Sequence, residues 1–283
     1  MFVIAGALIV VCSVIGGFLM EKGNPSLLFQ PAELVIILGS AIGAFFIASP
    51  PRVVKVVAKN ITLIISSKEQ SKEKYLEILS LLYQLLSKIR KEGLISIESD
   101  IEAPDKSTIF NRYKSVMTNL DIIKFLCDNL KVIITTNVPP HELDDLMEVE
   151  IETNHHEAMV PSRSIAKIAD ALPGLGIVAA VLGVVLTMGK IDESPEVLGH
   201  SVGAALVGTF LGVLLCYGFA GPMATNLEHK AREDSVSLQI VKRALVAFVG
   251  GLPPQIAVEF ARRVIPGKEK PSFDELEKEI RGR

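Results

Sequence analysis

The sequence predicts an all-α integral membrane protein, with four transmembrane helices in two hairpins, a helical cytoplasmic insert and a cytoplasmic tail. The chain has 49% hydrophobic residues and a mean hydropathy of +0.41. It also contains four apolar runs without Asp, Glu, Lys or Arg, each close to the ~20 residues that a helix needs to cross a bilayer. These runs are Phe2 to Met20, Leu34 to Pro50, Ala171 to Gly189 and Leu198 to Thr225.

Residues 1–50 form the first predicted hairpin. Its first span, Phe2 to Met20, lacks a basic start and a small-residue cleavage site, so we expect a retained span and not a removed signal peptide. The Gly-Asn-Pro sequence at 23–25 breaks the helix, and Pro31 suits the first turn of the next one. We place the second span at about residues 34–50.

Residues 51–170 form a predicted cytoplasmic domain of helices. Apolar residues recur at helical spacing from Tyr75 to Ile89, which predicts an amphipathic helix that ends near Gly93. Two more helical patterns run from Leu120 to Thr136 and from Pro140 to Glu157. We expect these helices to stack as a compact bundle.

Residues 171–225 form the second predicted hairpin, with spans at about 171–189 and 198–225. A Ser-Pro sequence at 194–195 breaks the helix between the spans. Residues 226–283 are predicted to form a cytoplasmic helical extension and tail, which includes a short polar helix near the end.

Small residues and a threonine share one face of each span in the second hairpin. The faces comprise Pro173, Gly176, Ala180, Gly183 and Thr187 on the third span, and Ser201, Ala205, Gly208, Thr209, Gly212 and Cys216 on the fourth. Such faces let membrane helices approach a neighbour's backbone closely. We interpret the two helices as surrounding a group that brings its own charge, because the apolar runs offer no carboxylate.

Lysine and arginine predict the orientation. Basic residues follow the second and fourth runs, whereas the connectors at 21–33 and 190–197 hold one lysine each. The basic residues are Arg52, Lys55, Lys59, Lys68, Lys72 and Lys74 after the second run, and Lys230, Arg232, Lys242 and Arg243 after the fourth. By the positive-inside rule, both termini and the long insert are cytoplasmic.

His155 and His156 lie among acidic residues, and this grouping suggests a metal site because imidazole and carboxylate groups coordinate zinc. Their spacing matches no closed ligand set, and a solvated acidic helix face is the better interpretation. The sequence has no glycine-rich phosphate loop, nucleophile elbow or Cys-x-x-Cys pair. We therefore expect no enzyme, no cofactor, no metal and no nucleic-acid partner.

The threonines and prolines of the second hairpin admit two interpretations each. Thr187 can bond the carbonyl one turn back or serve a pathway, and both remain open. Thr209 is mid-span on the small face, where we favour a water-lined path or a partner side chain. Pro173 and Pro222 lie near the cytoplasmic ends of their helices, either as ordinary helix ends or, as we favour, as a hinge.

Three segments of the spans carry a distinctive pattern. They are Gln30-Pro31-Ala32-Glu33-Leu34-Val35-Ile36-Ile37, Leu172-Pro173-Gly174-Leu175-Gly176-Ile177-Val178-Ala179-Ala180-Val181, and Val207-Gly208-Thr209-Phe210-Leu211-Gly212 with Tyr217-Gly218-Phe219 and Pro222. These segments resemble the MotA family of bacterial flagellar stator subunits. The resemblance extends over nearly the whole chain, including the Pro271-Ser272-Phe273 segment.

The resemblance implies a torque generator in the bacterial inner membrane. Family members are arranged as a ring, understood to be a pentamer, around two helices of a MotB-type partner. That partner is a single-span peptidoglycan-binding protein whose Asp carries the ion. The family's rotor-facing charges, which meet the switch protein FliG, match Arg90 and Glu98. Its hinge prolines match Pro173 and Pro222. Its channel threonine matches Thr209.

Ala180 bears on the choice of ion. Sodium-driven relatives tend to carry a hydroxyl at this position, and a methyl group offers one oxygen ligand fewer, so protons are preferred. A sodium-driven stator remains an alternative, as does an energiser of the ExbB or TolQ kind, which usually has three spans. A secondary transporter would need a polar cluster at broken helices, and the spans offer none.

Overall fold

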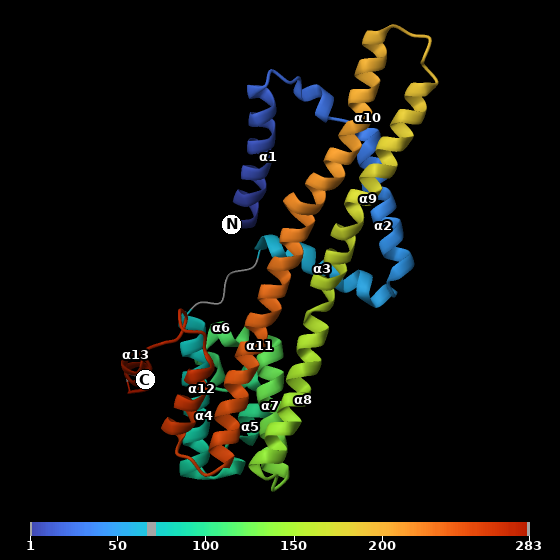
Figure 1. The fold of residues 1–283 in the computed structure, drawn as a ribbon. Coiled ribbons are helices and arrows are strands. Elements are labelled where there is room, and N and C mark those ends of the chain that lie inside the picture. Colours follow the sequence, from blue (N-terminus) through green and yellow to red (C-terminus); the bar gives the residue numbers. More distant parts are fainter. Residues whose placement is uncertain (1, 67–71, 282–283) are drawn as a thin grey trace. The chain divides into compact units, whose positions relative to one another are not determined.

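The computed structural model describes residues 2–66 and 72–281, and these residues form helices and connecting turns without a strand (Figure 1). The prediction of an all-α chain is therefore confirmed for the described residues. Lys68, one of the basic residues used above for orientation, lies outside them. The chain forms two compact units. The described part of the first unit is 2–66 and 158–230, and that of the second is 72–157 and 231–281.

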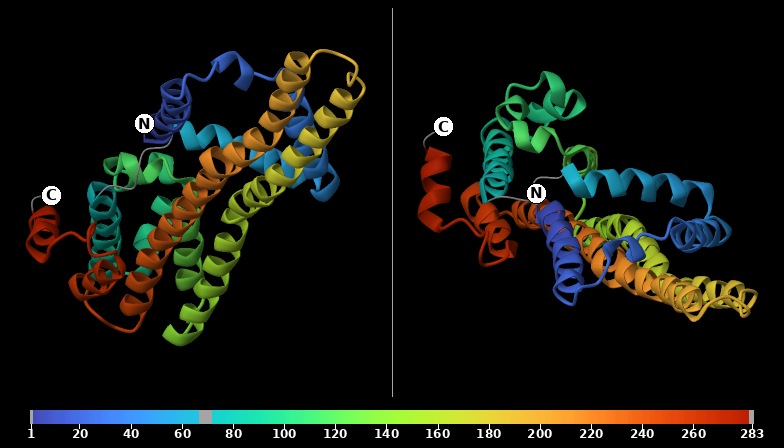
Figure 2. Two further views of the ribbon diagram at one scale, coloured as in Figure 1. Left: turned by 45° about the horizontal axis from the view of Figure 1, so that its top comes forward. Right: turned by 90° about the horizontal axis from the view of Figure 1, so that it is seen from above.

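The first unit contains the apolar helices. Its elements are α1 (Phe2–Met20), a 3₁₀ turn (Pro25–Leu28), α2 (Pro31–Ala48), α3 (Pro51–Ser66), α9 (Val160–Met188), α10 (Pro195–Leu215), a π-helical turn (Cys216–Ala220) and the first ten residues of α11 (Gly221–Val249). Helices α9 and α10 run side by side in opposite directions in every view (Figures 1 and 2). Much of the apolar surface faces outward, and α1 has no buried residue at all.

Four helical stretches are long and apolar enough to cross a membrane, as the sequence predicted. They are Phe2–Met20, Pro25–Ala48, Pro140–Met188 and Pro195–Val249. Helix α2 starts three residues earlier than the span expected from the apolar run, because Pro31 occupies its first turn, where the missing N–H costs no hydrogen bond. The amphipathic helix α3, which begins at Pro51, was not predicted as a separate element.

The second unit is a bundle around a core of large side chains. Its elements are α4 (Lys72–Glu92), α5 (Glu98–Glu102), α6 (Lys114–Met117), α7 (Leu120–Thr135), α8 (Pro140–Ala158), residues 231–249 of α11, α12 (Pro254–Val264), α13 (Phe273–Arg281) and 3₁₀ turns at Leu94–Ile97, Pro104–Lys106 and Phe110–Arg112. Its largest fully buried side chains include Tyr75, Phe110, Tyr113 and Phe125. The predicted amphipathic helix ends where expected, at Glu92 before Gly93, whose φ of 90° suits glycine.

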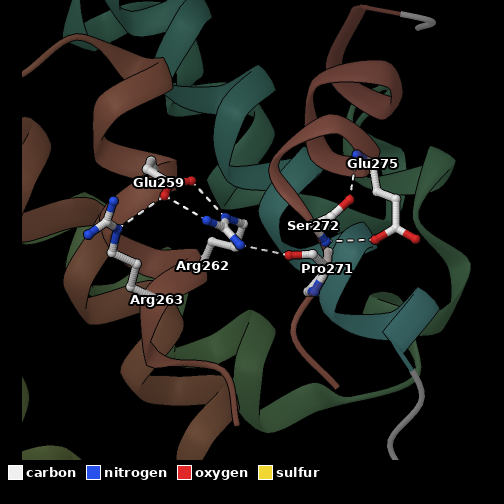
Figure 3. Close-up of polar contacts among 6 residues, drawn as sticks. All are labelled: Glu259, Arg262, Arg263, Pro271, Ser272 and Glu275. Carbon is white, nitrogen blue, oxygen red and sulfur yellow. Dashed lines mark hydrogen bonds and ion pairs between the residues drawn. The ribbon is translucent and has the colours of Figure 1, made fainter. Parts of the chain in front are cut away.

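Polar contacts fix the tail onto this unit (Figure 3). Arg262 donates through Nε to Glu259 at 2.7 Å and through a terminal nitrogen to the carbonyl of Pro271 at 2.8 Å. Ser272 and Glu275 then cap α13 reciprocally: the Ser272 N–H donates to the Glu275 carboxylate at 2.6 Å, and the Glu275 N–H donates to the Ser272 hydroxyl at 3.1 Å. The tail is therefore an ordered part of the bundle.

Candidate functional site

Glycines let α9 and α10 touch backbone to backbone. A Cβ atom on Gly212 would lie 2.6 Å from the carbonyl oxygen of Leu172 and 2.8 Å from Cα of Gly176. A Cβ atom on Gly176 would lie 2.8 Å from the carbonyl oxygen of Gly208. No larger residue fits at these positions without moving a helix.

The predicted small faces are confirmed, and they pack against each other. Gly176, Ala180 and Thr187 are buried on α9, whereas Val181 and Val185 are 55% and 62% exposed. On α10, the buried residues include Ala205, Gly208 and Gly212, together with Cys216 of the π-helical turn that follows. The sequence pattern alone was interpreted as two faces that surround a group from outside the chain. Within the chain, they meet each other and a side chain of α2.

That side chain is Glu33, and it corrects the sequence analysis. We expected no carboxylate among the apolar helices, because the second apolar run begins at Leu34. The helix itself begins at Pro31 and includes Glu33, which is only 9% exposed. A Cβ atom on Gly208 would lie 2.6 Å from its Oε2, and one on Gly183 would lie 3.5 Å from its Oε1.

The Oε2 atom of Glu33 is buried and has no hydrogen-bond partner among the described residues. Gly183 and Gly208 lack the side chains that would fill its place, so the two glycines make room for the carboxylate. The sequence did contain a signal for this contact. If Pro31 belongs to the first turn of a helix, then Glu33 two residues later is already inside that helix.

The predicted pathway residues lie near this carboxylate. Ala180 is 8% exposed, and its backbone nitrogen would lie 3.0 Å from a Cβ atom on Gly208. Thr209 follows Gly208, is half-buried, and its hydroxyl has no hydrogen bond to any residue that the structure describes. Thr187 is buried and donates to the carbonyl of Gly183 at 2.9 Å, which is the local bond expected of a threonine in a helix.

Neither proline ends a helix. Pro173 lies inside α9, and Pro222 is the second residue of α11, directly after the π-helical turn. In that turn the Gly221 N–H donates to the carbonyl of Cys216 five residues back, a widening that accommodates the proline ring. Helical backbone continues on both sides of each proline, so a simple helix-end role is excluded.

The predicted rotor-facing charges flank the turn after α4. Arg90 lies in the last turn of α4 and Glu98 is the first residue of α5. Both side chains are exposed, and neither forms an ion pair with a described residue. The turn between them is closed at Gly93, whose N–H donates to the carbonyl of Ile89 at 2.9 Å.

Asp100 fixes the geometry of this turn, a role that the sequence analysis missed. Its side chain is buried; Oδ2 accepts from Lys88 at 2.8 Å and Oδ1 accepts from the Ser107 hydroxyl at 2.5 Å. The Ser107 oxygen in turn accepts from the N–H groups of Ile109 and Phe110. One carboxylate therefore joins α4, α5 and the following turns.

Two further polar groups of the second unit are explained by local contacts. Lys242, which we counted as a basic flanking residue, is 1% exposed and lies 2.5 Å from Glu148 and 3.1 Å from Asp144. The hydrogen bond from Lys242 is the main cause that lowers the pKa of Glu148. His155 contacts the Ser235 hydroxyl at 2.8 Å, and no three His, Cys, Asp or Glu side chains in the described ranges are grouped to hold a metal ion.

Two family models match the chain. Residues 4–93 match the motility protein A N-terminal model, and residues 118–240 match the MotA/TolQ/ExbB proton channel family. Motility protein A of Salmonella typhimurium is 42% identical over 281 residues, with 99% of this chain and 95% of that protein covered. The chain belongs to the MotA family. Its membership of this proton channel family and its four apolar helices together indicate a membrane protein that crosses the bilayer several times.

A second relative also matches over nearly its whole length. Chemotaxis protein LafT of Vibrio parahaemolyticus is 37% identical over 273 residues, with 96% of each covered. The fold is similar to that of the MotAB structure from C. jejuni, with a TM-score of 0.79 at 17% identity, covering 96% of this chain and 98% of that one. It is also similar to the flagellar MotAB stator complex from Bacillus subtilis, with a TM-score of 0.75 at 24% identity, covering 94% and 96%.

Proposed function

We propose that the chain is a stator subunit of the bacterial flagellar motor, which couples ion flow through the inner membrane to torque on the rotor. The observation that carries this proposal is the full-length similarity to motility protein A. The structure contributes two regions suited to this function. One is a tightly packed pair of apolar helices, and the other is a polar bundle that presents exposed charges of both signs at one turn.

The ion would be carried by a MotB-type partner with an intramembrane Asp, and the subunits would surround it as a homopentamer in the lipid bilayer. Outward-facing apolar residues of α1 and α9 support contacts with lipid and with neighbouring subunits. In this arrangement, residues 1–50 and 171–225 form two membrane hairpins. Residues 51–170 and 226–283 are then cytoplasmic, as are both termini.

Rotor contact is assigned to Arg90 and Glu98, which would meet charges of the switch protein FliG. Exposed ion pairs contribute only about 0–1 kcal/mol each, so single neutralisations should slow swimming modestly. The double reversal Arg90→Glu with Glu98→Lys should abolish swimming, while the protein still inserts into the membrane. Normal swimming by the double mutant would place the contact elsewhere.

A matched control uses the exposed pair Asp121 and Lys124 on α7 of the same unit. Asp121→Lys with Lys124→Glu changes the same number of charges on α7 and leaves Arg90 and Glu98 in place. These cells should swim at close to wild-type speed. A loss equal to that of the Arg90 and Glu98 double reversal would show that the effect is a general one of surface charge.

The hinge is assigned to Pro173 and Pro222. Both lie within continuous helix, where a proline removes one hydrogen bond and permits bending. The Ser162 hydroxyl donates to the carbonyl of Ala224 at 2.8 Å and ties α9 to α11. Pro173→Ala and Pro222→Ala should each assemble with the partner but turn the rotor several-fold more slowly. Normal rotation by both variants would remove the hinge from the proposal.

Protons are the proposed ion, because Ala180 offers no oxygen ligand and its methyl group is buried. Cells that depend on this stator should swim when external sodium is replaced by potassium at constant ionic strength. They should stop when a protonophore collapses the proton gradient. Sodium-dependent swimming that resists a protonophore at alkaline pH would assign a sodium-driven stator instead.

A further inference from the structure

Glu33 is the one acidic residue in α2, and the structure gives it an unusual environment. It is nine-tenths buried, its Oε2 has no hydrogen-bond partner among the described residues, and it points at the glycines of α9 and α10. Ala180 and Gly208 lie near the middle of their apolar runs. The carboxylate therefore reaches the central level of the α9–α10 pair, and not its polar end.

No side chain of residues 2–66 or 72–281 forms an ion pair or hydrogen bond with the Glu33 carboxylate. The carboxylate lies next to Gly183 and Gly208, and Ala179, Ala180 and Ala205 lie beside these two glycines; none of the five ionises. The titratable residues of α10 are Glu196 and His200 in its first two turns, and both are exposed. Within 171–188 of α9 there is no titratable residue.

A buried carboxylate without a partner is costly when it is ionised, and binding a proton removes the charge. A sodium ion would not satisfy it, because a hard cation needs several oxygen ligands and the nearby groups are methyls and helical backbone. The chemistry of the site therefore selects a proton over a metal cation.

We propose that Glu33 is a proton-binding site of this chain, which holds a proton while α2 packs on α9 and α10 and releases it when that contact opens. The reaction is the reversible addition of one proton to one carboxylate. The site is separate from the Asp expected on the partner. Its part in driving rotation rests on the proposed function, whereas the binding of the proton does not.

The first experiment measures the proton directly. Infrared spectra of the full-length chain in proteoliposomes, without any partner, should show the C=O stretch of a protonated carboxylic acid at neutral pH. The band should vanish in Glu33→Gln, persist at a shifted frequency in Glu33→Asp, and remain unchanged in the control Glu196→Gln. Absence of the band in the wild type, or its persistence in Glu33→Gln, would overturn the proposal.

The second experiment tests the link to rotation in cells that supply the partner. Glu33→Gln imitates the protonated form, so rotation should slow several-fold and lose its dependence on external pH, at unchanged protein level and complex recovery. Glu33→Asp should keep the pH dependence. A Glu33→Gln motor with the wild-type speed and pH profile would remove Glu33 from the pathway. If the wild-type chain drives no rotation while the infrared band depends on Glu33, the proposed function fails and the proton site stands.

Discussion

The two units of this chain are packed with side chains of opposite size. In the first unit, α9 and α10 approach through glycines until backbone touches backbone, and large apolar side chains such as those of Val181 and Val185 face outward. In the second unit, large side chains such as Tyr75 and Phe125 fill the interior.

The two units also differ in whether their buried charged side chains have partners. The buried Asp100 of the second unit accepts from both Lys88 and Ser107, and the buried Lys242 lies between two carboxylates. In the first unit, by contrast, Oε2 of Glu33 is buried and has no hydrogen-bond partner among the described residues. It follows that one unit is built for an apolar solvent, where close backbone contact replaces the hydrophobic effect, and the other for water.

The largest expected effect comes from adding one methyl group to the backbone contact of the first unit. Gly212→Ala places a Cβ atom against the carbonyl of Leu172, which is backbone and cannot rotate away. We expect this variant to destabilise the packing of α9 on α10 by about 3 kcal/mol, the upper end of the usual cost of overpacking, because a backbone atom cannot move aside. Less folded protein should then be found in the membrane. Protein level and gel-filtration profile in detergent measure this.

Gly203→Ala on the same helix is the control, because nothing lies within 4 Å of a Cβ atom there. It should be neutral or slightly stabilising, since alanine favours helix more than glycine does. Equal loss in both variants would mean that glycine content, and not close contact, decides the stability of α10.

The next effect concerns the polar network of the second unit. Asp100→Ala removes the acceptor of Lys88 and Ser107, and a buried polar group left without its partner costs about 1–3 kcal/mol. The thermal unfolding midpoint of the full chain should fall, and swimming should slow because the turn that presents Arg90 and Glu98 is less fixed. Asp105→Ala, at a nearby exposed site, should change neither quantity.

The smallest effect is a pH dependence of the tail. Hydrogen bonds from Lys72 and from the Ser272 backbone lower the pKa of Glu275 from 4.5 to about 2. A lowered pKa in the folded state stabilises α13 above pH 4.5, and this contribution is lost as the pH falls from 4.5 towards 2. The hydrogen-exchange protection of α13, measured relative to the unfolded chain at the same pH, should therefore fall on acidification while that of α4 does not.

Lys72→Met removes the largest cause of that shift. In this variant the protection of α13 should already be lower at neutral pH, and acidification should reduce it little further. Unchanged exchange in both conditions would show that the capping bonds of Ser272 alone hold the helix.

Periodicity and hydropathy were enough to predict the four apolar helices and the helices α4, α7 and α8, since each of these has an apolar stripe or an apolar run, but they did not separate α3 from the rest of the insert. The small faces of α9 and α10 were also predicted correctly, because helical geometry fixes which residues share a face. What these faces touch was not predictable. A pattern within one helix shows its small side but not whether a neighbour of the same chain or another molecule occupies it.

Charged residues were the weaker part of the prediction. Glu33 was placed in a connector because the apolar run begins at the next residue, although Pro31 already marked the helix start. Asp100 and Lys242 resembled ordinary solvated charges, since their partners are supplied by tertiary contacts. The prominence of Arg90 and Glu98 came from the family resemblance, and the structure adds that their side chains are exposed beside a closed turn.

In the proposed motor, the first unit of this chain supplies closely packed apolar helices with the buried acid Glu33, and a partner supplies the ion carrier. Proton flux into proteoliposomes tests this division most directly, with the purified chain alone and with its MotB-type partner. We predict background flux from the chain alone, because in the part of the chain that the structure describes no ionisable side chain is bonded to Glu33 to take over its proton. We also predict a clear flux from the complex, which is lost when the partner's membrane Asp is replaced by Asn. Substantial flux from the chain alone would contradict the division.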